Sequence, residues 1–192
     1  MFSLPPVTQA LILINAVVFF AQPVLGGSVI SSLALWPLGS QFMPWQVLTY
    51  AFVHASLPHL LFNMFGVFMF GGDLERVWGP RRYLSYYLVC ALSAAAAQLL
   101  VTGLTGAQYP TVGASGALFG LLLAFAMVYP NRTVVPLIPP IPMRASVFVA
   151  LYGALELVLG VTGTQAGVAH FAHLGGLAGG FVFMRVWRSR RR

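Results

Sequence analysis

Hydrophobic residues gather into long segments along this chain, with polar residues confined mainly to the stretches between them. A helix needs roughly 20 mostly apolar residues to cross the hydrocarbon core of a bilayer. Six segments come close to that length, and they cover residues 7–25, 58–78, 83–101, 112–129, 145–161 and 168–187. The pattern predicts an all-α membrane protein with six transmembrane helices, in one domain covering residues 1–192. No Arg or Lys precedes the first segment, which we therefore interpret as a span and not as a signal peptide.

The composition supports this interpretation. Hydrophobic residues make up 59 % of the chain and charged residues 7 %, and the mean hydropathy is +0.86. Ordinary soluble domains contain about 25 % charged residues, so a soluble fold would lack the charges to cover its surface. A net charge of +7 is also typical of nucleic-acid-binding proteins. In so apolar a chain, membrane topology explains the excess better, and we expect no nucleic-acid partner.

The basic residues, all of them arginines, occupy alternate connections between the predicted helices. None lies within 26–57, 102–111 or 162–167, whereas the intervening connections and the C-terminal tail contain them. Positive charges favour the cytoplasmic side of a membrane. We therefore expect both termini in the cytoplasm and three connections outside, in what we take to be a bacterial plasma membrane. The connection 26–57 is rich in aromatic residues, and we expect it to be structured and partly embedded.

Few residues with catalytic chemistry remain inside the predicted spans. The H-E-x-x-H motif of helical metalloproteases is absent, as are nucleotide-binding loops. An aspartyl dyad needs two carboxylates, but Asp73 is the only aspartate and Glu156 is the only acid well inside a span. These observations predict an activity that uses no metal and no cofactor. They leave serine and histidine as the candidate pair.

Ser115 and His173 lie near the outward ends of the fourth and sixth predicted helices. Ser115 follows Pro110 by five residues, roughly 7 Å along a helix. Small residues at Gly116 and Gly120, and at Gly176 and Gly180, allow two helices to approach closely in lipid. Such packing would bring Ser115 next to His173, and the imidazole could then remove the hydroxyl proton of the serine.

Two polar residues of the second predicted helix lie at a similar depth. His59 and Asn63 are four residues apart and share one helix face. Their N–H groups, together with the backbone N–H of Ser115, are candidates for stabilising an oxyanion. We expect structural roles for four other residues: Cys90 as a small buried side chain, His54 in the outer connection, and His170 and Glu156 as packing or hydrogen-bonding partners.

Four motifs together resemble the rhomboid family of intramembrane serine proteases. They are HLLFNM at 59–64, ERVWG at 75–79, GASG at 113–116 and AHLGG at 172–176, in an order that covers nearly the whole chain. The resemblance implies a six-helix core with a water-accessible cavity that opens to the outer face. It further implies substrates that are single-pass membrane proteins, cleaved near the outer interface after entering between the second and fifth helices.

The same resemblance assigns roles to individual residues. Ser115 would be the nucleophile and His173 the general base of a dyad, with His59 and Asn63 as oxyanion donors. His170 does not match the catalytic position. No acid lies near His173 in the sequence or at the expected outward depth unless Glu156 reaches it, so we do not expect a triad. Phe119 stands where some family members carry Tyr. A phenylalanine can stack on the imidazole of His173 but has no hydroxyl to bond it, so the orientation of His173 would rest on packing alone.

Two other functions are compatible with a six-helix membrane protein. A non-catalytic rhomboid-like protein would bind membrane clients, but such proteins typically lack Ser115 or His173, and both are present here. A transporter or channel would need a polar pathway across the whole bilayer. The polar residues cluster in the outer half, which favours the protease.

Overall fold

The computed structural model describes residues 4–39, 41–137, 139–163 and 169–189. In chain order its elements are α1 (Pro6–Leu25), α2 (Gly27–Leu33), α3 (Gln46–Thr49), η1 (Tyr50–Phe52), α4 (Leu57–Gly66), η2 (Val67–Gly71), α5 (Gly72–Trp78), α6 (Pro80–Thr105), α7 (Ser115–Val128), β1 (Thr133–Val134), β2 (Met143–Arg144), α8 (Ala145–Thr162) and α9 (His170–Ser189).

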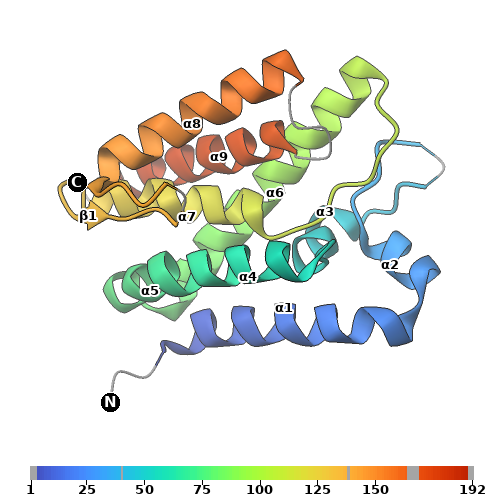
Figure 1. Ribbon diagram of the computed structural model, residues 1–192, viewed down its shortest axis with the longest axis horizontal. Coiled ribbons are helices and arrows are strands. Elements are labelled where there is room, and N and C mark those ends of the chain that lie inside the picture. Colours follow the sequence, from blue (N-terminus) through green and yellow to red (C-terminus); the bar gives the residue numbers. More distant parts are fainter. Residues whose placement is uncertain (1–3, 40, 138, 164–168, 190–192) are drawn as a thin grey trace.

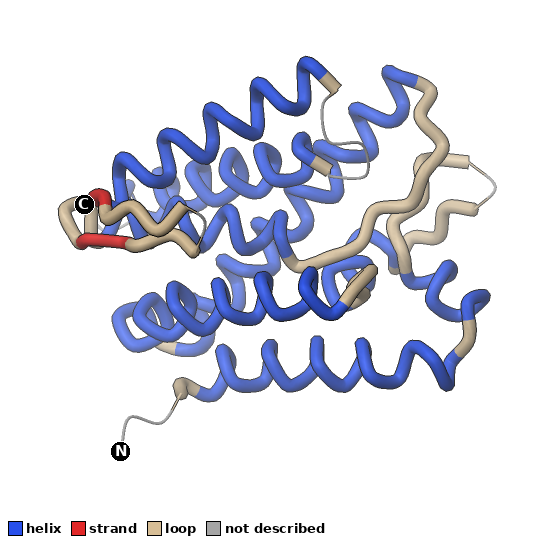
Figure 2. Tube along the Cα trace, viewed as in Figure 1, coloured by secondary structure: helices blue, strands red, loops and turns tan. Residues whose placement is uncertain are grey.

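Each of the six predicted segments corresponds to helical structure. The second segment is a continuous run of α4, η2 and α5, in which η2 is a π-helical turn. The third helix, α6, is longer than predicted, and the fourth, α7, begins at Ser115 instead of residue 112. The predicted start of the sixth segment, residue 168, lies outside the described residues. The all-α prediction is confirmed, with one short two-stranded ribbon, β1–β2, in the described part of the chain (Figure 2).

Helix α7 lies in the interior of the bundle, with α8 and α9 on one side and α4 and α1 on the other (Figure 1). Helix α6 passes behind it and packs closely on α9. The tyrosines of α6 are fully buried, and the hydroxyl of Tyr86 donates a 2.7 Å hydrogen bond to the carbonyl of Gly120 on α7. Cys90 is buried against α7, as predicted. Buried side chains of α6 therefore hold α7 at the centre of the bundle.

Within the part of the chain that the structure describes, three helices, α1, α6 and α8, are long and apolar enough to cross a membrane. A fourth span is possible if Gln46–Phe52 is joined to Leu57–Trp78, although these segments are bent by 97°. Helix α7 is shorter, at 14 residues. The residues of α8 whose side chains are buried are Ala145, Phe148 and Glu156. Most of the α8 surface is therefore apolar and exposed, as expected for a helix that faces lipid.

A buried carboxylate fixes the beginning of α1. Glu75 of α5 accepts hydrogen bonds from the backbone N–H groups of Val7 and Thr8, at 2.9 and 2.7 Å, and from the Thr8 hydroxyl at 2.8 Å. The first N–H groups of a helix lack partners within the helix, and their dipoles favour a negative charge. Glu75 therefore joins the start of α1 to the end of the second helical run.

The connection between α1 and α4 is structured, as predicted from its aromatic content. It contains α2, α3 and η1, and residue 40 within it is outside the described set. The fully buried side chain of Gln46 accepts from the Trp36 backbone N–H at 3.2 Å and donates to the carbonyls of Ser32 and Gln41. These bonds tie the parts of the connection to one another, and the backbone pairing of Leu35 with Thr111 joins it to the loop before α7.

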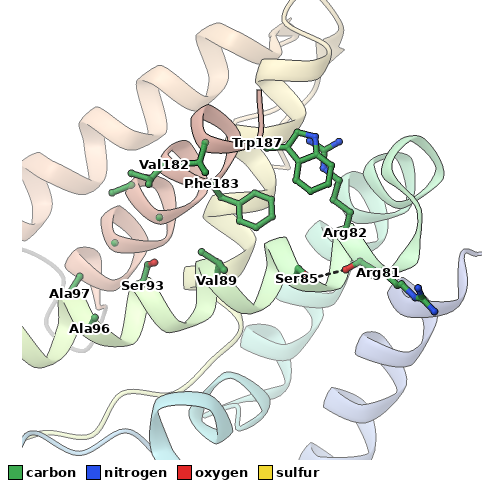
Figure 3. A pocket seen from close by; sticks show the side chains of 14 residues that line it. Arg81, Arg82, Ser85, Val89, Ser93, Ala96, Ala97, Val182, Phe183 and Trp187 are labelled. Atoms are coloured by element: carbon green, nitrogen blue, oxygen red, sulfur yellow. Dashed lines mark hydrogen bonds between the residues drawn. The ribbon is translucent and has the colours of Figure 1, made fainter. Parts of the chain in front are cut away.

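A lateral groove of about 960 Å³ runs along the line where α6 and α9 meet, and residues of both helices line it (Figure 3). The small side chains of Ala96 and Ala97 lie at one end of the groove, and Arg82 lies at the other (Figure 3). The Arg82 guanidinium stacks over the ring of Trp187, 3.7 Å from the ring centre, and is 4.8 Å from the centre of Trp78. This cluster joins α5, α6 and α9 at the arginine-rich end of the bundle.

Candidate functional site

An extended loop precedes α7 and places Ser115 in the interior of the bundle. Thr111 pairs with Leu35 through two 2.9 Å backbone hydrogen bonds, and the Gly113 N–H donates to the Tyr50 carbonyl at 2.9 Å. Gly113 has φ +118°, a backbone conformation that side chains other than glycine rarely adopt. Ser115 is the first residue of α7. It therefore sits at the helix start, and not one turn inside the helix as the sequence suggested.

Helix α9 presents His173 to this serine. The Nε2 atom of His173 is 2.8 Å from the Oγ atom of Ser115, which is hydrogen-bond distance. The two helices cross closely here, because a Cβ atom on Gly176 would collide with the carbonyl oxygen of Gly116. Gly180 faces Tyr86 and Cys90 of α6 instead of α7. The expected approach of α7 and α9 thus depends on Gly116 and Gly176.

Phe119, one turn after Ser115, stacks on the imidazole of His173. The ring centres are 4.4 Å apart and the planes differ by 9°. The aromatic face restricts rotation of the imidazole and leaves its nitrogen atoms free to contact groups in the plane of the ring.

Glu156 of α8 does reach His173, so the expectation that packing alone orients this histidine is wrong. The Glu156 Oε2 atom is 2.9 Å from His173 Nδ1 and 2.6 Å from His170 Nδ1. The contact to His170 is an aligned hydrogen bond, whereas the oxygen lies off the hydrogen-bonding direction of His173 Nδ1. Exposure is 9 % for Glu156, 4 % for His170 and 7 % for His173. The acid near His173 is thus Glu156, the one exception that the sequence left open.

His59 and Asn63 lie on α4, across the cavity from α9. A Cβ atom on Gly113 would be 2.7 Å from the His59 ring and 3.8 Å from Ser115 Oγ, so the ring and the hydroxyl border the same small space. Asn63 is buried, and its side-chain nitrogen donates to the His59 carbonyl at 2.9 Å. That nitrogen carries two hydrogens, and one of them remains after this bond is made. Both residues are thus available beside Ser115.

His54 lies in the loop between η1 and α4 and supports His59 from behind. The two rings pack edge to face with centres 4.9 Å apart. Its backbone N–H and carbonyl both bond the side chain of Gln22 on α1. Burial, and next the neighbouring His59, lower the pKa of His54 to about 4, so this ring is neutral at physiological pH. The structural role expected for His54 agrees with these contacts.

A cavity of about 780 Å³ contains these groups. Ser115 and Phe119 line it from α7, His59 and Asn63 from α4, and His173 from α9. It continues as a groove between the aromatic residues of α4 and η2 and those of α8, and the strand β1 borders its far end. The cavity is therefore an apolar channel with a few polar groups grouped at one place, an arrangement typical of small-molecule and peptide sites.

Three side chains of the site have the chemistry of metal ligands. Donor atoms of Glu156, His170 and His173 all lie within 4.8 Å of one another. Ligands of one tetrahedral zinc ion, each at about 2.0–2.1 Å, are separated by about 3.3 Å. The contacts of 2.6 and 2.9 Å are shorter and match hydrogen bonds and ion pairs instead.

Two contributions to the site were missed in the sequence. Gly113 was part of a motif, but its positive φ and its contact with His59 depend on how the loop folds. Glu156 carried a signal that could have been used. Consecutive helices joined by a short connection usually pack side by side, and Glu156 and His170 lie only 14 residues apart across the connection between α8 and α9.

Comparison with known proteins agrees with the four sequence motifs. Residues 41–190 match the Rhomboid domain family. The chain is 28 % identical to the rhomboid protease GluP of Bacillus subtilis over 185 residues, which cover 92 % of this chain and 34 % of GluP. It is also 28 % identical to the rhomboid protease GlpG of Photorhabdus laumondii over 191 residues, covering 96 % of this chain and 62 % of GlpG.

A third relative is the mitochondrial Rhomboid protein 1 of Saccharomyces cerevisiae, 29 % identical over 162 residues that cover 74 % of this chain and 43 % of that protein. The chain thus spans about a third to three fifths of the length of these relatives. The family match covers most of the chain, and the apolar helices fit an integral membrane protein. The chain belongs to the rhomboid family of helical membrane proteins.

Proposed function

We propose that this chain is an intramembrane serine endopeptidase in which Ser115 is the nucleophile and His173 is the general base. The observation that carries the proposal is the 2.8 Å contact between Ser115 Oγ and His173 Nε2 at a cavity wall. A serine hydroxyl is a weak nucleophile until an adjacent base accepts its proton. Two of the relatives are rhomboid proteases by name, which supports the same reaction class.

The proton moves between two atoms during the reaction. His173 Nε2 accepts the Ser115 proton as Oγ forms a bond to the scissile carbonyl carbon. The imidazolium then gives this proton to the leaving amine nitrogen as the carbon–nitrogen bond breaks, which leaves an acyl-enzyme. A water molecule repeats the sequence, with Nε2 as base, and releases the carboxylic acid and free Ser115.

The negative oxygen of the tetrahedral intermediate needs donors on the opposite side from His173. We assign this role to the side chains of His59 and Asn63 and to the backbone N–H of Ser115. Ser115 is the first residue of α7, so its N–H points out of the helix start, where the helix dipole also favours negative charge. Removing one such donor typically costs about 100- to 1,000-fold in kcat.

The proposed substrates are single-pass membrane proteins that enter between α4 and α8. Phe62 and Phe65 of α4 line one side of the groove, and Phe148 and Tyr152 of α8 line the other. A peptide bond within an intact helix is shielded from attack because its backbone is wrapped in hydrogen bonds. Suitable substrates would therefore have small or helix-breaking residues close to the outer interface, where the segment can unwind next to Ser115.

The arrangement of charges supports a defined orientation. Helix α1 begins and α9 ends at the arginine-rich end of the bundle (Figure 1). We propose that this end faces the cytoplasm of a bacterial cell, that residues 1–192 form one rhomboid domain with six spans, and that the cavity opens to the outer face.

The proposal is tested with purified protein in liposomes, a model single-pass substrate and a fluorophosphonate probe. We expect the wild-type protein to cleave the substrate and to be labelled at Ser115. Ser115→Ala should abolish both signals, and His173→Ala should reduce both by at least about 100-fold, the usual contribution of a general base.

Matched controls distinguish chemistry from folding. Ser85→Ala changes an exposed serine whose hydroxyl bonds the Arg81 carbonyl within its own helix, so it should behave like the wild type. Cleavage by Ser115→Ala at the wild-type rate would overturn the mechanism, as would a folded wild-type protein that neither cleaves nor labels.

A further inference from the structure

Behind the candidate catalytic pair, three titratable side chains form a buried unit. The Glu156 Oε2 atom lies between His170 Nδ1, at 2.6 Å, and His173 Nδ1, at 2.9 Å. The two other acids in the chain have partners elsewhere: Asp73 pairs with Arg76 and Arg132, and Glu75 holds the start of α1. Glu156 is therefore the carboxylate that contacts both His170 and His173.

The position of Glu156 is costly unless the carboxylate has partners. It lies in a helix whose surface is mostly apolar, and a charged group inside a membrane span is rare and usually functional. Its side chain turns inward and contacts two imidazoles. A hydrogen bond from His170 compensates part of the lost hydration, and a positive charge on His173 would compensate far more.

The contact has a consequence for the tautomer of His173. A proton on Nδ1 faces the negative oxygen of Glu156, whereas a lone pair there would be repelled by it. The favoured neutral form therefore carries its proton on Nδ1 and leaves Nε2 unprotonated toward Ser115. This is the form that a general base requires.

We propose that Glu156 is a positioning residue for His173, and that His170 holds the Glu156 carboxylate in place. This inference rests on the proposed protease function. When Nε2 takes the Ser115 proton, the new imidazolium faces an ionised carboxylate 2.9 Å away, and Glu156 itself neither gains nor loses a proton. The imperfect alignment in the free protein does not oppose this role, because catalytic hydrogen bonds often tighten only when substrate binds.

His170 supports the carboxylate without touching Ser115. It is the first residue of α9, and its ring centre is 6.4 Å from that of His173. Its Nδ1–H donates to the same oxygen that faces His173, which fixes the position of that oxygen. An asparagine at this position retains a donor, whereas a leucine removes it.

The test compares Glu156→Gln with the wild type in liposomes, after the fraction of reactive enzyme has been measured by titration with the fluorophosphonate. We expect kcat per titrated site to fall about 10- to 100-fold, less than the roughly 100- to 10,000-fold that general-base catalysis contributes, because His173 itself remains, while KM stays within about twofold. The rate of fluorophosphonate labelling should fall in parallel. Glu156→Asp, which keeps the charge on a shorter side chain, should retain more activity than Glu156→Gln.

Three further variants make the result specific. Glu75→Gln neutralises another buried carboxylate, at the opposite end of the bundle, and should leave kcat per titrated site unchanged. His170→Leu should lower kcat per site about three- to tenfold, and His170→Asn by less, because it retains a donor to Glu156.

The outcomes separate this inference from the proposed function. If the wild type cleaves and Glu156→Gln has the same kcat per titrated site, Glu156 has no positioning role, although the protease proposal stands. A loss confined to the number of titratable sites would show a purely structural role and would also overturn the inference. If the wild type itself neither labels nor cleaves, the protease proposal fails first.

Discussion

The ring of Phe119 lies parallel to the imidazole of His173, with 4.4 Å between the ring centres. The stack covers one face of the imidazole, while Ser115 and Glu156 lie close to its two nitrogen atoms. Phe119 of α7 therefore constrains the face of the imidazole, and Ser115 of α7 and Glu156 of α8 contact its nitrogen atoms. A tyrosine hydroxyl is not needed for either constraint.

We therefore expect Phe119→Leu to lower kcat about three- to tenfold, because an aromatic pair contributes about 0.5–1.5 kcal/mol beyond its buried area and 1.4 kcal/mol corresponds to tenfold in rate. Phe119→Tyr retains the stack and should stay within about twofold of the wild type. The measurement is kcat per titrated site in liposomes. Equal rates for the leucine variant and the wild type would show that the stack does not position His173.

Gly113→Ala should remove activity although residue 113 has no reactive group. A Cβ atom there would lie 2.7 Å from the His59 ring, and the φ of +118° is strained for alanine by about 1–3 kcal/mol. The ring or the loop must move, which displaces a proposed oxyanion donor. We expect kcat/KM to fall at least about 100-fold, the cost of losing one such donor.

Gly103→Ala is the matched control for this prediction. Gly103 lies in α6, and a Cβ atom added to it would meet no other group within 4 Å. Alanine also favours a helix interior by about 1 kcal/mol over glycine. This variant should be fully active and at least as stable as the wild type, and wild-type activity in Gly113→Ala would contradict the assignment of His59.

Trp187→Ala should destabilise the protein without changing its chemistry. The Arg82 guanidinium is 3.7 Å from the centre of the Trp187 ring (Figure 3). Trp187 lies near the end of α9, whereas His173 lies near its start. Loss of a desolvated cation–π contact costs about 2 kcal/mol, so the thermal midpoint in detergent should fall. Trp187→Phe retains an aromatic face and should lose less. A drop in kcat per titrated site would instead link this cluster to the reaction.

The helical segments could be predicted from the sequence because a membrane span requires a long apolar run, and such runs are visible without tertiary information. The proximity of Ser115 and His173 was also accessible, since Gly116 and Gly176 mark a close crossing of helices. The start of α7 was misplaced because apolarity continues through residues 112–114 while the loop is held extended by Leu35 and Tyr50. That contact comes from a distant part of the chain.

The contact between Glu156 and His173 was missed for a different reason. Separation along the sequence and the expected depth of each residue both placed Glu156 away from His173, but α8 and α9 are neighbours in the bundle. The acid of one helix therefore faces the histidines of the next.

The length of α7 determines the routes by which water and the protein substrate would reach Ser115. A helix of 14 residues spans about 21 Å, whereas the hydrocarbon core is about 30 Å thick. Since Ser115 is the first residue of α7, it would lie below the level of the headgroups if the other end of the helix reaches the opposite surface. Each peptide cleaved consumes one water molecule, and that water would have to descend along the loop before α7. The protein substrate would arrive sideways from the lipid, so the two reactants would meet at Ser115 from perpendicular directions.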